Sequence, residues 1–461
     1  MSRKSNALSR RAFLCAAAAS CVAVTSRSLA RPADVRRGLP NMLLIMVDDL
    51  GNGDLASHGA KDMRTPHIDG LMNAGIRFDQ FYANCPVCSP TRAALLSGRF
   101  PDMAGVPGVI RTYWDNNWGY LRQDMELLPA VLRRGGYHTA MVGKWHLGME
   151  SPNKPNERGF DHFQGFLGDM MDDYENHRRH GIDYMRENDT PVYPHGHATD
   201  IFSQWSVDYV NYQQTAEAPF FLYLAYNAPH TPIEPPEGWL KKVKDREPGI
   251  DEARARLVAL TEHMDDGIGK VVQALKDTGQ YEDTLIIFCS DNGGYLAVGA
   301  TNGPVRGGKQ DMYEGGIKVP MCVSWPAKIA PGQRNMEPVM SMDFYPTLCE
   351  LARVPYDQNI DGANLVPTLM GTGQVDPERT MIWMRREGGP HGGQDYYAIR
   401  RGPWKLLQNT PFEPLELYNL DDDPMEATPL PGNHPMKGTL FAALREHINQ
   451  SGSIPWQRPK P

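Results

Sequence analysis

Three short apolar runs limit the fold of this chain more than any other feature of its sequence. Each run is followed within a few residues by a polar cluster: Met42–Val47 by Asp48 and Asp49, Phe220–Ala225 by Asn227 and His230, and Leu285–Cys289 by Asp291 and Asn292. Continuous apolar runs of this length are typical of strands that are buried on both faces of a mostly parallel sheet. Open α/β sheets bind their ligands beyond the carboxyl ends of the strands, so we expect the three polar clusters to meet at one edge.

Segments with helical periodicity separate the predicted strands. Apolar residues recur at three- and four-residue spacing in Leu127–Arg134 and again in Glu252–Lys276. Strands that alternate with helices indicate a layered α/β fold. We therefore predict a large sheet, mixed but mostly parallel and flanked by helices, within residues 38–372.

The sequence changes character beyond about residue 372. Three short segments alternate there with glycine- and proline-containing turns: Met381–Met384, Tyr396–Ile399 and Trp404–Leu407. This alternation is typical of antiparallel strands joined by turns. Residues 373–461 would thus form a smaller C-terminal α+β domain that contains a short antiparallel sheet.

The first thirty residues have the features of an export signal. A basic head precedes the apolar run Phe13–Val24, and Ser28-Leu29-Ala30 supplies small residues at a cleavage-site spacing. The run is too short to span a bilayer comfortably, so we expect no stable membrane association. Ser9-Arg10-Arg11 resembles a twin-arginine signal, with an ordinary secretory signal as the alternative. We predict a periplasmic or secreted protein that has the export machinery as a partner.

Charge and cysteine content exclude several classes of protein. The formal net charge is −8, and removal of the predicted signal, which contains five basic residues and no acid, lowers it to −13. Such a surface disfavours nucleic acid, so a local group of cations would have to attract an anionic substrate. Two of the seven cysteines lie in the signal, and the other five are too irregularly spaced for a disulfide framework. We place Cys289 and Cys322 in the core.

The most informative segment begins at Cys88 and continues Cys-Ser-Pro-Thr-Arg-Ala-Ala-Leu-Leu-Ser-Gly-Arg through Arg99. One interpretation is an exposed loop before a helix, in which Cys85 and Cys88 form a redox pair, but a thioredoxin-like strand–helix–strand pattern is not evident. The segment closely resembles the modification motif of the formylglycine-dependent sulfatases, a family of the alkaline phosphatase superfamily. The resemblance implies an alkaline-phosphatase-like fold and a maturation enzyme that oxidises Cys88 to formylglycine (3-oxoalanine).

Formylglycine implies a particular course of catalysis. The hydrated aldehyde carries two hydroxyl groups: one attacks sulfur, and the other expels sulfate when the aldehyde re-forms. Arg92, one helical turn after Cys88, would bond the hydrate and the sulfate region. A helix that begins at this point would also favour an anion. The encoded chain would be inactive until a formylglycine-generating or sulfatase-maturating enzyme modifies it, and export by the twin-arginine route would require that step in the cytoplasm.

Two acidic segments, 48–54 and 290–294, resemble the metal-binding loops of the same family. Taken singly, such segments are more often turns or helix caps. Hard dications prefer carboxylate and amide oxygens, and the resemblance implies calcium, with magnesium as the lesser alternative. The predicted ligands are Asp48, Asp49, Asp291, Asn292 and the modified side chain of Cys88. The ion would polarise a sulfate oxygen and help to deprotonate the hydrate.

Further family-like blocks supply cations and proton carriers. Lys144 and His146 belong to the block Gly143–Gly148, where two residues two apart on a strand would face the same side. The resemblance implies that Lys144 bridges the aldehyde oxygen and the sulfate, and that His146 transfers a proton during sulfate elimination. His230 and Lys309 would bind the sulfate and neutralise charge on the leaving oxygen, one of them as general acid. The sequence leaves open which of these two donates the proton.

The leaving group is the least determined part of the substrate. We expect a sulfated polysaccharide or its oligosaccharides, because exported members of this family often degrade glycans; a small aryl sulfate is the alternative. Loops 169–180, 195–199 and 385–391 are candidates for the substrate rim, where Arg386 and His391 would hold a sugar hydroxyl, a carboxylate or a second sulfate. Two other hypotheses are a phosphomonoester or phosphonate ester hydrolase of the same superfamily and a catalytically inactive glycan-binding relative.

Overall fold

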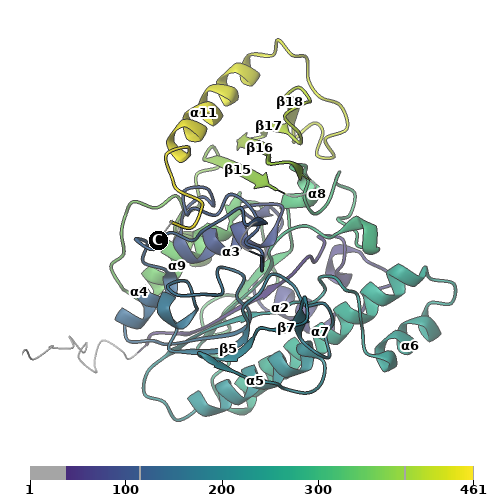
Figure 1. The fold of residues 1–461 in the computed structure, drawn as a ribbon, viewed down its shortest axis with the longest axis vertical. Coiled ribbons are helices and arrows are strands. Elements are labelled where there is room, and N and C mark those ends of the chain that lie inside the picture. Colours follow the sequence, from purple (N-terminus) through teal and green to yellow (C-terminus); the bar gives the residue numbers. More distant parts are fainter. Residues whose placement is uncertain (1–37, 114–115, 389–390, 460–461) are drawn as a thin grey trace, which may run out of the picture.

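The computed structural model describes residues 38–113, 116–388 and 391–459. A large α/β part carries a smaller part that contains the last helix, α11 (Figure 1). The predicted export signal lies outside the described residues. None of the helices within the described ranges is long and apolar enough to cross a bilayer.

A ten-stranded sheet forms the centre of the large part, in the order β13-β2-β12-β11-β1-β10-β4-β5-β8-β9. Its strands are β1 (Asn41–Val47), β2 (Ile76–Phe78), β4 (His138–Lys144), β5 (His162–Phe166), β8 (Met185–Glu187), β9 (Thr190–Pro191), β10 (Phe220–Ala225), β11 (Thr284–Ser290), β12 (Met321–Ser324) and β13 (Gln333–Asn335). The neighbours from β11 to β5 are all parallel, whereas β12 and β8 pair antiparallel with the strands beside them. The predicted mixed, mostly parallel sheet is therefore confirmed.

The central strand β1 explains why its apolar run is continuous. It pairs with β10 on one side and with β11 on the other, both in parallel. Alternate side chains of a strand point to opposite faces. Leu43, Ile45 and Val47 accordingly lie in one hydrophobic cluster, and Met42, Leu44 and Met46 lie in another. Both faces are covered, so a polar side chain within this strand would be buried in an apolar core.

Helices cover both faces of the sheet. One face packs against α2 (Pro66–Asn73), α5 (Ala198–Gln213) and α7 (Glu252–Asp277), and α6 (Glu237–Arg246) lies against α7. The other face packs against α3 (Cys88–Ser97), α4 (Leu128–Arg134) and α9 (Phe344–Leu351). The two helices predicted from periodicity, α4 and α7, are confirmed, and α7 begins where the Asp251 carboxylate accepts hydrogen bonds from the first-turn amides of Ala253 and Arg254.

The smaller part is a four-stranded antiparallel sheet with a helix on it. The sheet contains β15 (Thr380–Glu387), β16 (Gln394–Arg401), β17 (Trp404–Gln408) and β18 (Glu416–Asn419), and α11 (Pro435–Ser451) packs against it. The short antiparallel sheet predicted after residue 372 is therefore confirmed. The exact domain boundary at residue 372 stays a prediction.

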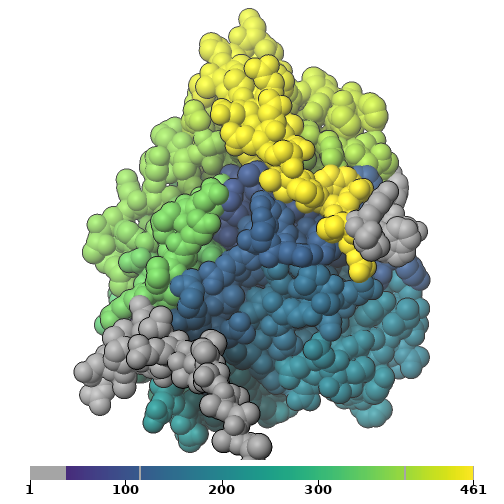
Figure 2. All heavy atoms as spheres, turned by 60° about the vertical axis from the view of Figure 1, so that its left-hand side comes forward, coloured from purple at the N-terminus to yellow at the C-terminus, as the bar shows by residue number. Residues whose placement is uncertain are grey.

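The chain after α11 returns to the large part. In Figure 2 the yellow C-terminal segment descends from the small part across the blue surface formed by the first third of the chain. Trp456 stacks on Trp118, with ring centroids 5.0 Å apart, and Arg458 pairs with Glu150 at 2.7 Å. The last residues thus tie the two parts together.

Candidate active site

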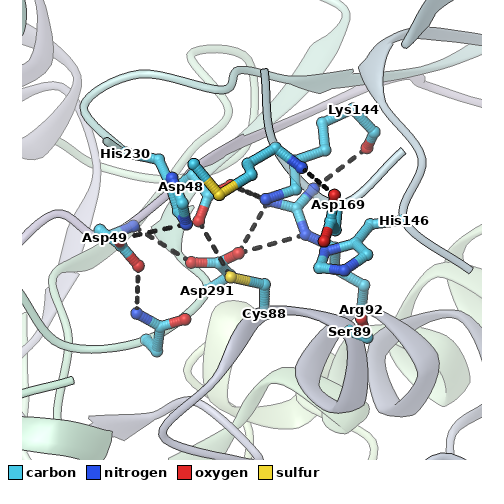
Figure 3. Close-up of polar contacts among 12 residues, drawn as sticks. Asp48, Asp49, Cys88, Ser89, Arg92, Lys144, His146, Asp169, His230 and Asp291 are labelled. Atoms are coloured by element: carbon cyan, nitrogen blue, oxygen red, sulfur yellow. Dashed lines mark hydrogen bonds and ion pairs between the residues drawn. The ribbon is translucent and has the colours of Figure 1, made fainter. Parts of the chain in front are cut away.

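The polar clusters that follow the three central strands meet at one edge of the sheet, as predicted (Figure 3). Asp48 and Asp49 follow β1, His230 follows β10, and Asp291 follows β11, and each of these side chains is at least nine-tenths buried. Cys88 is the first residue of α3, whose amino terminus points into the same region. Asp49 and Asp291, which are 242 positions apart in the sequence, are therefore in direct contact because parallel strands end side by side.

Cys88 is buried, with only 3% of its surface exposed, so the expectation of an exposed loop is wrong. Its thiol donates a hydrogen bond to Asp48 Oδ1 at 3.2 Å. Burial and the neighbouring Asp48 carboxylate raise the pKa of this thiol well above its ordinary value. The encoded cysteine is therefore protonated at neutral pH and is a poor nucleophile, because the thiolate is the reactive form.

The structure contains no disulfide between Cys85 and Cys88. The five cysteines of the described chain are all free. The Cys85 thiol instead contacts the backbone oxygen of Met384, at 3.4 Å. Cys289 and Cys322 lie in the core, as predicted.

The acidic residues form a compact, oxygen-rich cluster. The Asn292 amide donates to Asp49 Oδ1 at 2.7 Å, and the backbone nitrogen of Asp49 donates to Asp291 Oδ1 at 3.2 Å. The amide oxygen of Asn292 is buried and finds no hydrogen-bond partner in the part of the chain that the structure describes. A buried polar atom without a partner is costly unless something else satisfies it. Three carboxylates and one free amide oxygen are donors of the kind that a hard dication requires.

Arg92 lies behind this cluster, completely buried. Its Nε and Nη2 both donate to Asp291 Oδ2, at 3.1 and 2.7 Å, and its Nη1 donates to the backbone oxygen of Lys144 at 3.1 Å. Although burial alone would lower its pKa, the Asp291 carboxylate keeps Arg92 fully charged. Arg92 therefore holds the acidic cluster in place from behind.

Lys144 and His146 both reach the site, but not from one strand face. Strand β4 ends at Lys144, and His146 has a left-handed backbone with φ of 58°. The prediction that the two residues share a strand is therefore wrong. Lys144 forms a buried ion pair with Asp48. Although burial would raise the pKa of Asp48, the charges of Lys144 and its neighbours hold that pKa well below the usual range.

The protonation of His146 follows from its contacts. Its Nε2 lies 2.7 Å from the backbone oxygen of Ile110, which can only accept, so Nε2 carries a proton. Its Nδ1 is buried and has no hydrogen-bond partner among the described residues. Burial, together with the charges of Lys144 and Arg92, holds the pKa of His146 well below its ordinary value. The ring is therefore neutral, with Nδ1 free to accept a proton.

His230 and Lys309 form the opposite side of the site. Lys309 Nζ lies 2.7 Å from Asp49 Oδ2, and this carboxylate raises the Lys309 pKa although burial would lower it. His230 Nδ1 lies 2.7 Å from the backbone oxygen of Thr231, so it donates there, and Nε2 lies 3.7 Å from Asp49 Oδ2. Burial and the Lys309 charge lower the His230 pKa. Lys309 thus keeps a permanent charge, whereas His230 is predominantly neutral.

A cavity of about 200 Å³ opens above Cys88. Its lining includes Cys88, His146, His230 and Lys309 from the predicted site. The remaining lining residues are Val87, Val109, Arg111, Asp169, Met170, Thr231, Tyr295, Gln310 and Glu387. A larger and shallower depression of about 640 Å³, lined by Lys61 and Arg254 among others, contains none of the predicted site residues.

The two rim residues predicted from sequence do not line this cavity. Arg386 pairs with Asp395 at 2.5 Å, and His391 Nε2 lies 3.3 Å from Arg385 Nη2. Their neighbour Glu387, at the end of β15, does line the cavity and pairs with Arg111 at 2.8 Å. Glu387 belongs to the predicted rim loop 385–391, and Asp169 and Met170, which also line the cavity, belong to the predicted rim loop 169–180. Arg111 was not predicted, because its place in the site depends on a contact with a residue 276 positions away.

Two family models match the chain. The model named Sulfatase matches residues 40–354, and the model named N-sulphoglucosamine sulphohydrolase, C-terminal, matches residues 308–453. The chain is 32% identical to N-acetylgalactosamine-6-sulfatase from Canis lupus familiaris, over 79% of this chain and 71% of that protein. It is 28% identical to the uncharacterized sulfatase YdeN of Escherichia coli strain K12, over 90% of this chain and 86% of that protein.

Solved structures show the same relationship. The structure of Ps i-CgsB in complex with k-i-k-neocarrahexaose has a TM-score of 0.83 and 31% identity, over 91% of this chain and 95% of that one. A phosphonate monoester hydrolase of Agrobacterium radiobacter has a TM-score of 0.63 at 21% identity, over 90% of this chain and 95% of that one, and shares the fold alone.

The fold is therefore alkaline-phosphatase-like. The chain belongs to the sulfatase family and is a sulfuric ester hydrolase.

Proposed function

We propose that this protein hydrolyses sulfate esters of polysaccharides or oligosaccharides, with formylglycine derived from Cys88 as its nucleophile and calcium as its metal ion. The observation that carries the proposal is the position of Cys88 at the amino terminus of α3, where it lines a cavity and touches a cluster of buried carboxylates. The relatives that support a saccharide substrate are an N-acetylgalactosamine-6-sulfatase and the neocarrahexaose-bound structure of Ps i-CgsB.

The acidic cluster fits a calcium ion. Asp48, Asp49, Asp291 and Asn292 would hold it together with the modified side chain of residue 88, and the unpartnered amide oxygen of Asn292 supports this donor set. Calcium accepts six to eight oxygen ligands in flexible geometry, whereas magnesium demands a stricter octahedron, so calcium suits a mixed carboxylate–amide cluster better. Bound there, the ion would polarise a sulfate oxygen.

Formylglycine would supply a hydrated aldehyde, which can both attack sulfur and release sulfate afterwards. The residues around it have complementary tasks. Lys144 would orient the hydrate and the sulfate through its charge. His146 offers Nδ1 as the acceptor of a proton, since Nε2 is committed to the Ile110 carbonyl. His230 and Lys309 would stabilise the leaving oxygen from the far side of the cavity.

Maturation and export would precede activity. A formylglycine-generating or sulfatase-maturating enzyme would modify Cys88, and the export machinery would carry the protein to the periplasm or the medium. Because Cys88 is buried in the folded chain, its modification would have to occur before folding is complete. A twin-arginine signal carries folded proteins and would therefore require modification in the cytoplasm.

The test compares the protein produced with and without a maturation enzyme. Mass analysis of the peptide that contains residue 88 should show the thiol replaced by an aldehyde only in the first sample. The matured protein should hydrolyse sulfated saccharides and aryl sulfates more efficiently than the matching phosphate or phosphonate esters. A preference for phosphorus esters would contradict the proposal, as would glycan binding without any turnover.

A matched pair of variants tests the role of Cys88. Cys88→Ala should reduce turnover by at least ~10³-fold, because the variant keeps only binding and electrostatic stabilisation. Cys85→Ala should keep its activity, because the Cys85 thiol contacts the Met384 backbone and not the acidic cluster. Both variants should unfold within a few degrees of the unmodified chain. Substantial turnover by Cys88→Ala would overturn the mechanism.

A further inference from the structure

The wall of the cavity carries three charged side chains outside the predicted catalytic set: Arg111, Asp169 and Glu387. Each is already paired. Arg111 Nη2 lies 2.8 Å from Glu387 Oε2, and Asp169 Oδ1 lies 3.0 Å from Arg179 Nε. The charged side chains of the wall are therefore held in carboxylate–guanidinium pairs. The floor near Cys88 instead contains several cations and the proposed metal-binding cluster.

The Arg111–Glu387 pair joins the two parts of the molecule at the cavity. Arg111 directly follows Ile110, whose carbonyl fixes the ring of His146, and Glu387 ends strand β15 of the small sheet. The Glu387 side chain is 1% exposed and that of Arg111 is 28% exposed. The guanidinium therefore faces the cavity more openly, with the carboxylate behind it.

Arg111 keeps hydrogen-bonding capacity beyond this pair. A guanidinium has five N–H donors, and Glu387 takes one of them. Its Nε is buried and has no partner within the described chain. Glu387, which it shares with Arg385, thus offsets part of the charge of Arg111 while donors remain for a ligand. Asp169, drawn in Figure 3, supplies acceptor oxygens to the same cavity.

Such a wall distinguishes hydroxyl groups from anions. A sugar hydroxyl donates and accepts at once, so it can bridge a guanidinium donor and a carboxylate acceptor. A second sulfate or a carboxylate on the ring would instead need an unpaired cation, because an anion buried without compensation is costly. Of the cavity-lining residues outside the floor, Arg111 is the one cation, and Glu387, which also lies 3.7 Å from the buried Arg385, is its partner at 2.8 Å and offsets part of its charge.

The size and apolar lining of the cavity restrict the ligand further. The volume of about 200 Å³ lies below the roughly 300–1,000 Å³ of pockets for drug-sized ligands, so it suits one ring and not an oligosaccharide. Val109 and Met170 provide apolar contacts, and Tyr295, which is 36% exposed, offers an aromatic face. A sugar ring has C–H faces that pack on such groups.

We infer that the cavity selects a sugar ring that carries the scissile sulfate and otherwise only uncharged groups, and that the Arg111–Glu387 pair discriminates against a second anionic group on that ring. This inference rests on the proposed function and defines its substrate class. Arg111 would contact the ring directly, and Glu387 would act by positioning Arg111 and neutralising it.

The test measures kcat/KM of the matured enzyme for monosulfated galactose and N-acetylgalactosamine isomers and for their disulfated counterparts. The wild type should prefer the monosulfated ring by at least ~10-fold, since a charged hydrogen bond left uncompensated is worth about that factor or more. Glu387→Gln removes the neutralising charge but keeps the shape of the side chain. It should shift the ratio of kcat/KM toward the disulfated sugar by roughly 10-fold, mainly through KM.

Two further variants keep the test decisive. Arg111→Gln should lower kcat/KM for monosulfated sugars without improving disulfated ones, which provides an independent readout if Glu387→Gln fails to fold. Glu446→Gln, on the exposed surface of α11, is the matched control and should leave the ratio unchanged.

The outcomes are distinguishable. Turnover of saccharides with no monosulfated preference, or an unchanged ratio in a folded Glu387→Gln protein, would overturn the inference alone. Hydrolysis of aryl sulfates without turnover of any saccharide would overturn the proposed substrate class and this inference with it.

Discussion

At the scale of single residues, the side-chain amide of Asn292 is informative because its nitrogen and its oxygen differ in their hydrogen bonding. Its nitrogen donates to Asp49 and to the Gly293 carbonyl, while its oxygen is buried without a partner within the described ranges. An unmet acceptor beside three carboxylates would be stabilised by a cation. The metal prediction can therefore be tested by thermal unfolding without any assay of activity.

We expect calcium to raise the Tm of the protein and a chelator to lower it. At 100 times its Kd, an ion that binds only the folded state stabilises it by about 2.7 kcal/mol. Asn292→Ala should need at least ~10-fold more calcium for the same increase in Tm. The exposed Asn449→Ala on α11 is the control and should respond like the wild type. A Tm that does not depend on calcium would contradict the metal site.

His146 gives a second prediction at the residue scale. Since its Nε2 donates to the Ile110 carbonyl and its Nδ1 is free, the ring is arranged to accept a proton. His146→Gln should therefore lower kcat of the matured enzyme by about 10²–10⁴-fold, the usual contribution of general acid–base catalysis. The split between kcat and KM is the measurement, and a change confined to KM would show that His146 only binds substrate.

At the scale of elements, the sequence patterns predicted the central strands and the long helix well. The apolar run of each strand and the three- and four-residue spacing of the helix continue over the whole length of the element. Strand β1, helix α7 and the small sheet all appear where the patterns place them. The turn after β4 was missed, because the backbone reversal at His146 has no periodic signal and depends on contacts with the Phe166 and Leu167 carbonyls.

The small sheet is attached to the large part through a buried charge. Lys405 on β17 is completely buried and pairs with Glu314 of α8 (Glu314–Ile317) at 2.9 Å and with Glu426 at 2.7 Å. Although burial would raise the pKa of Glu314, Lys405 lowers it to about 2, while burial raises that of Glu426 to about 7. Removal of the lysine would leave the two buried acids without the cation that they share.

Lys405→Met should therefore destabilise the fold by about 3–5 kcal/mol, as expected when one partner of a buried ion pair is lost. Chemical denaturation is the measurement. Lys241→Met on α6 is the control: its side chain is 73% exposed and should contribute less than ~1 kcal/mol. Equal stability of the two variants would show that the buried charges are not important for the attachment of the sheet.

At the scale of the whole molecule, α11 is joined to the large part by a titratable contact. His447 Nε2 lies 2.8 Å from Asp102 Oδ2, and both side chains are buried. Burial alone would lower the pKa of His447, but the Asp102 carboxylate outweighs it and raises that pKa. A raised histidine pKa stabilises the folded state below the unfolded value of about 6.5, and this stabilisation is lost as the pH rises through the folded pKa.

The difference in Tm between the wild type and His447→Gln should therefore be larger near pH 6 than near pH 9. Thermal unfolding across this range measures it, with Asp102→Asn as a second variant that should show the same trend. A difference that stays constant with pH would mean that packing against Phe100, whose ring lies 5.0 Å from that of His447, explains the whole contribution.

The sequence alone determined the strand–helix alternation, the family and the residues closest to the chemistry, because these depend on local periodicity and on short motifs. The tertiary structure decided which distant residues share a wall with Cys88. Arg111 and Glu387 lie on separate parts of the chain and carry no motif, and they meet at the cavity because the small sheet packs against the large part of the molecule. The substrate class that we propose therefore depends on a long-range contact, whereas the reaction class is encoded in the local sequence around Cys88.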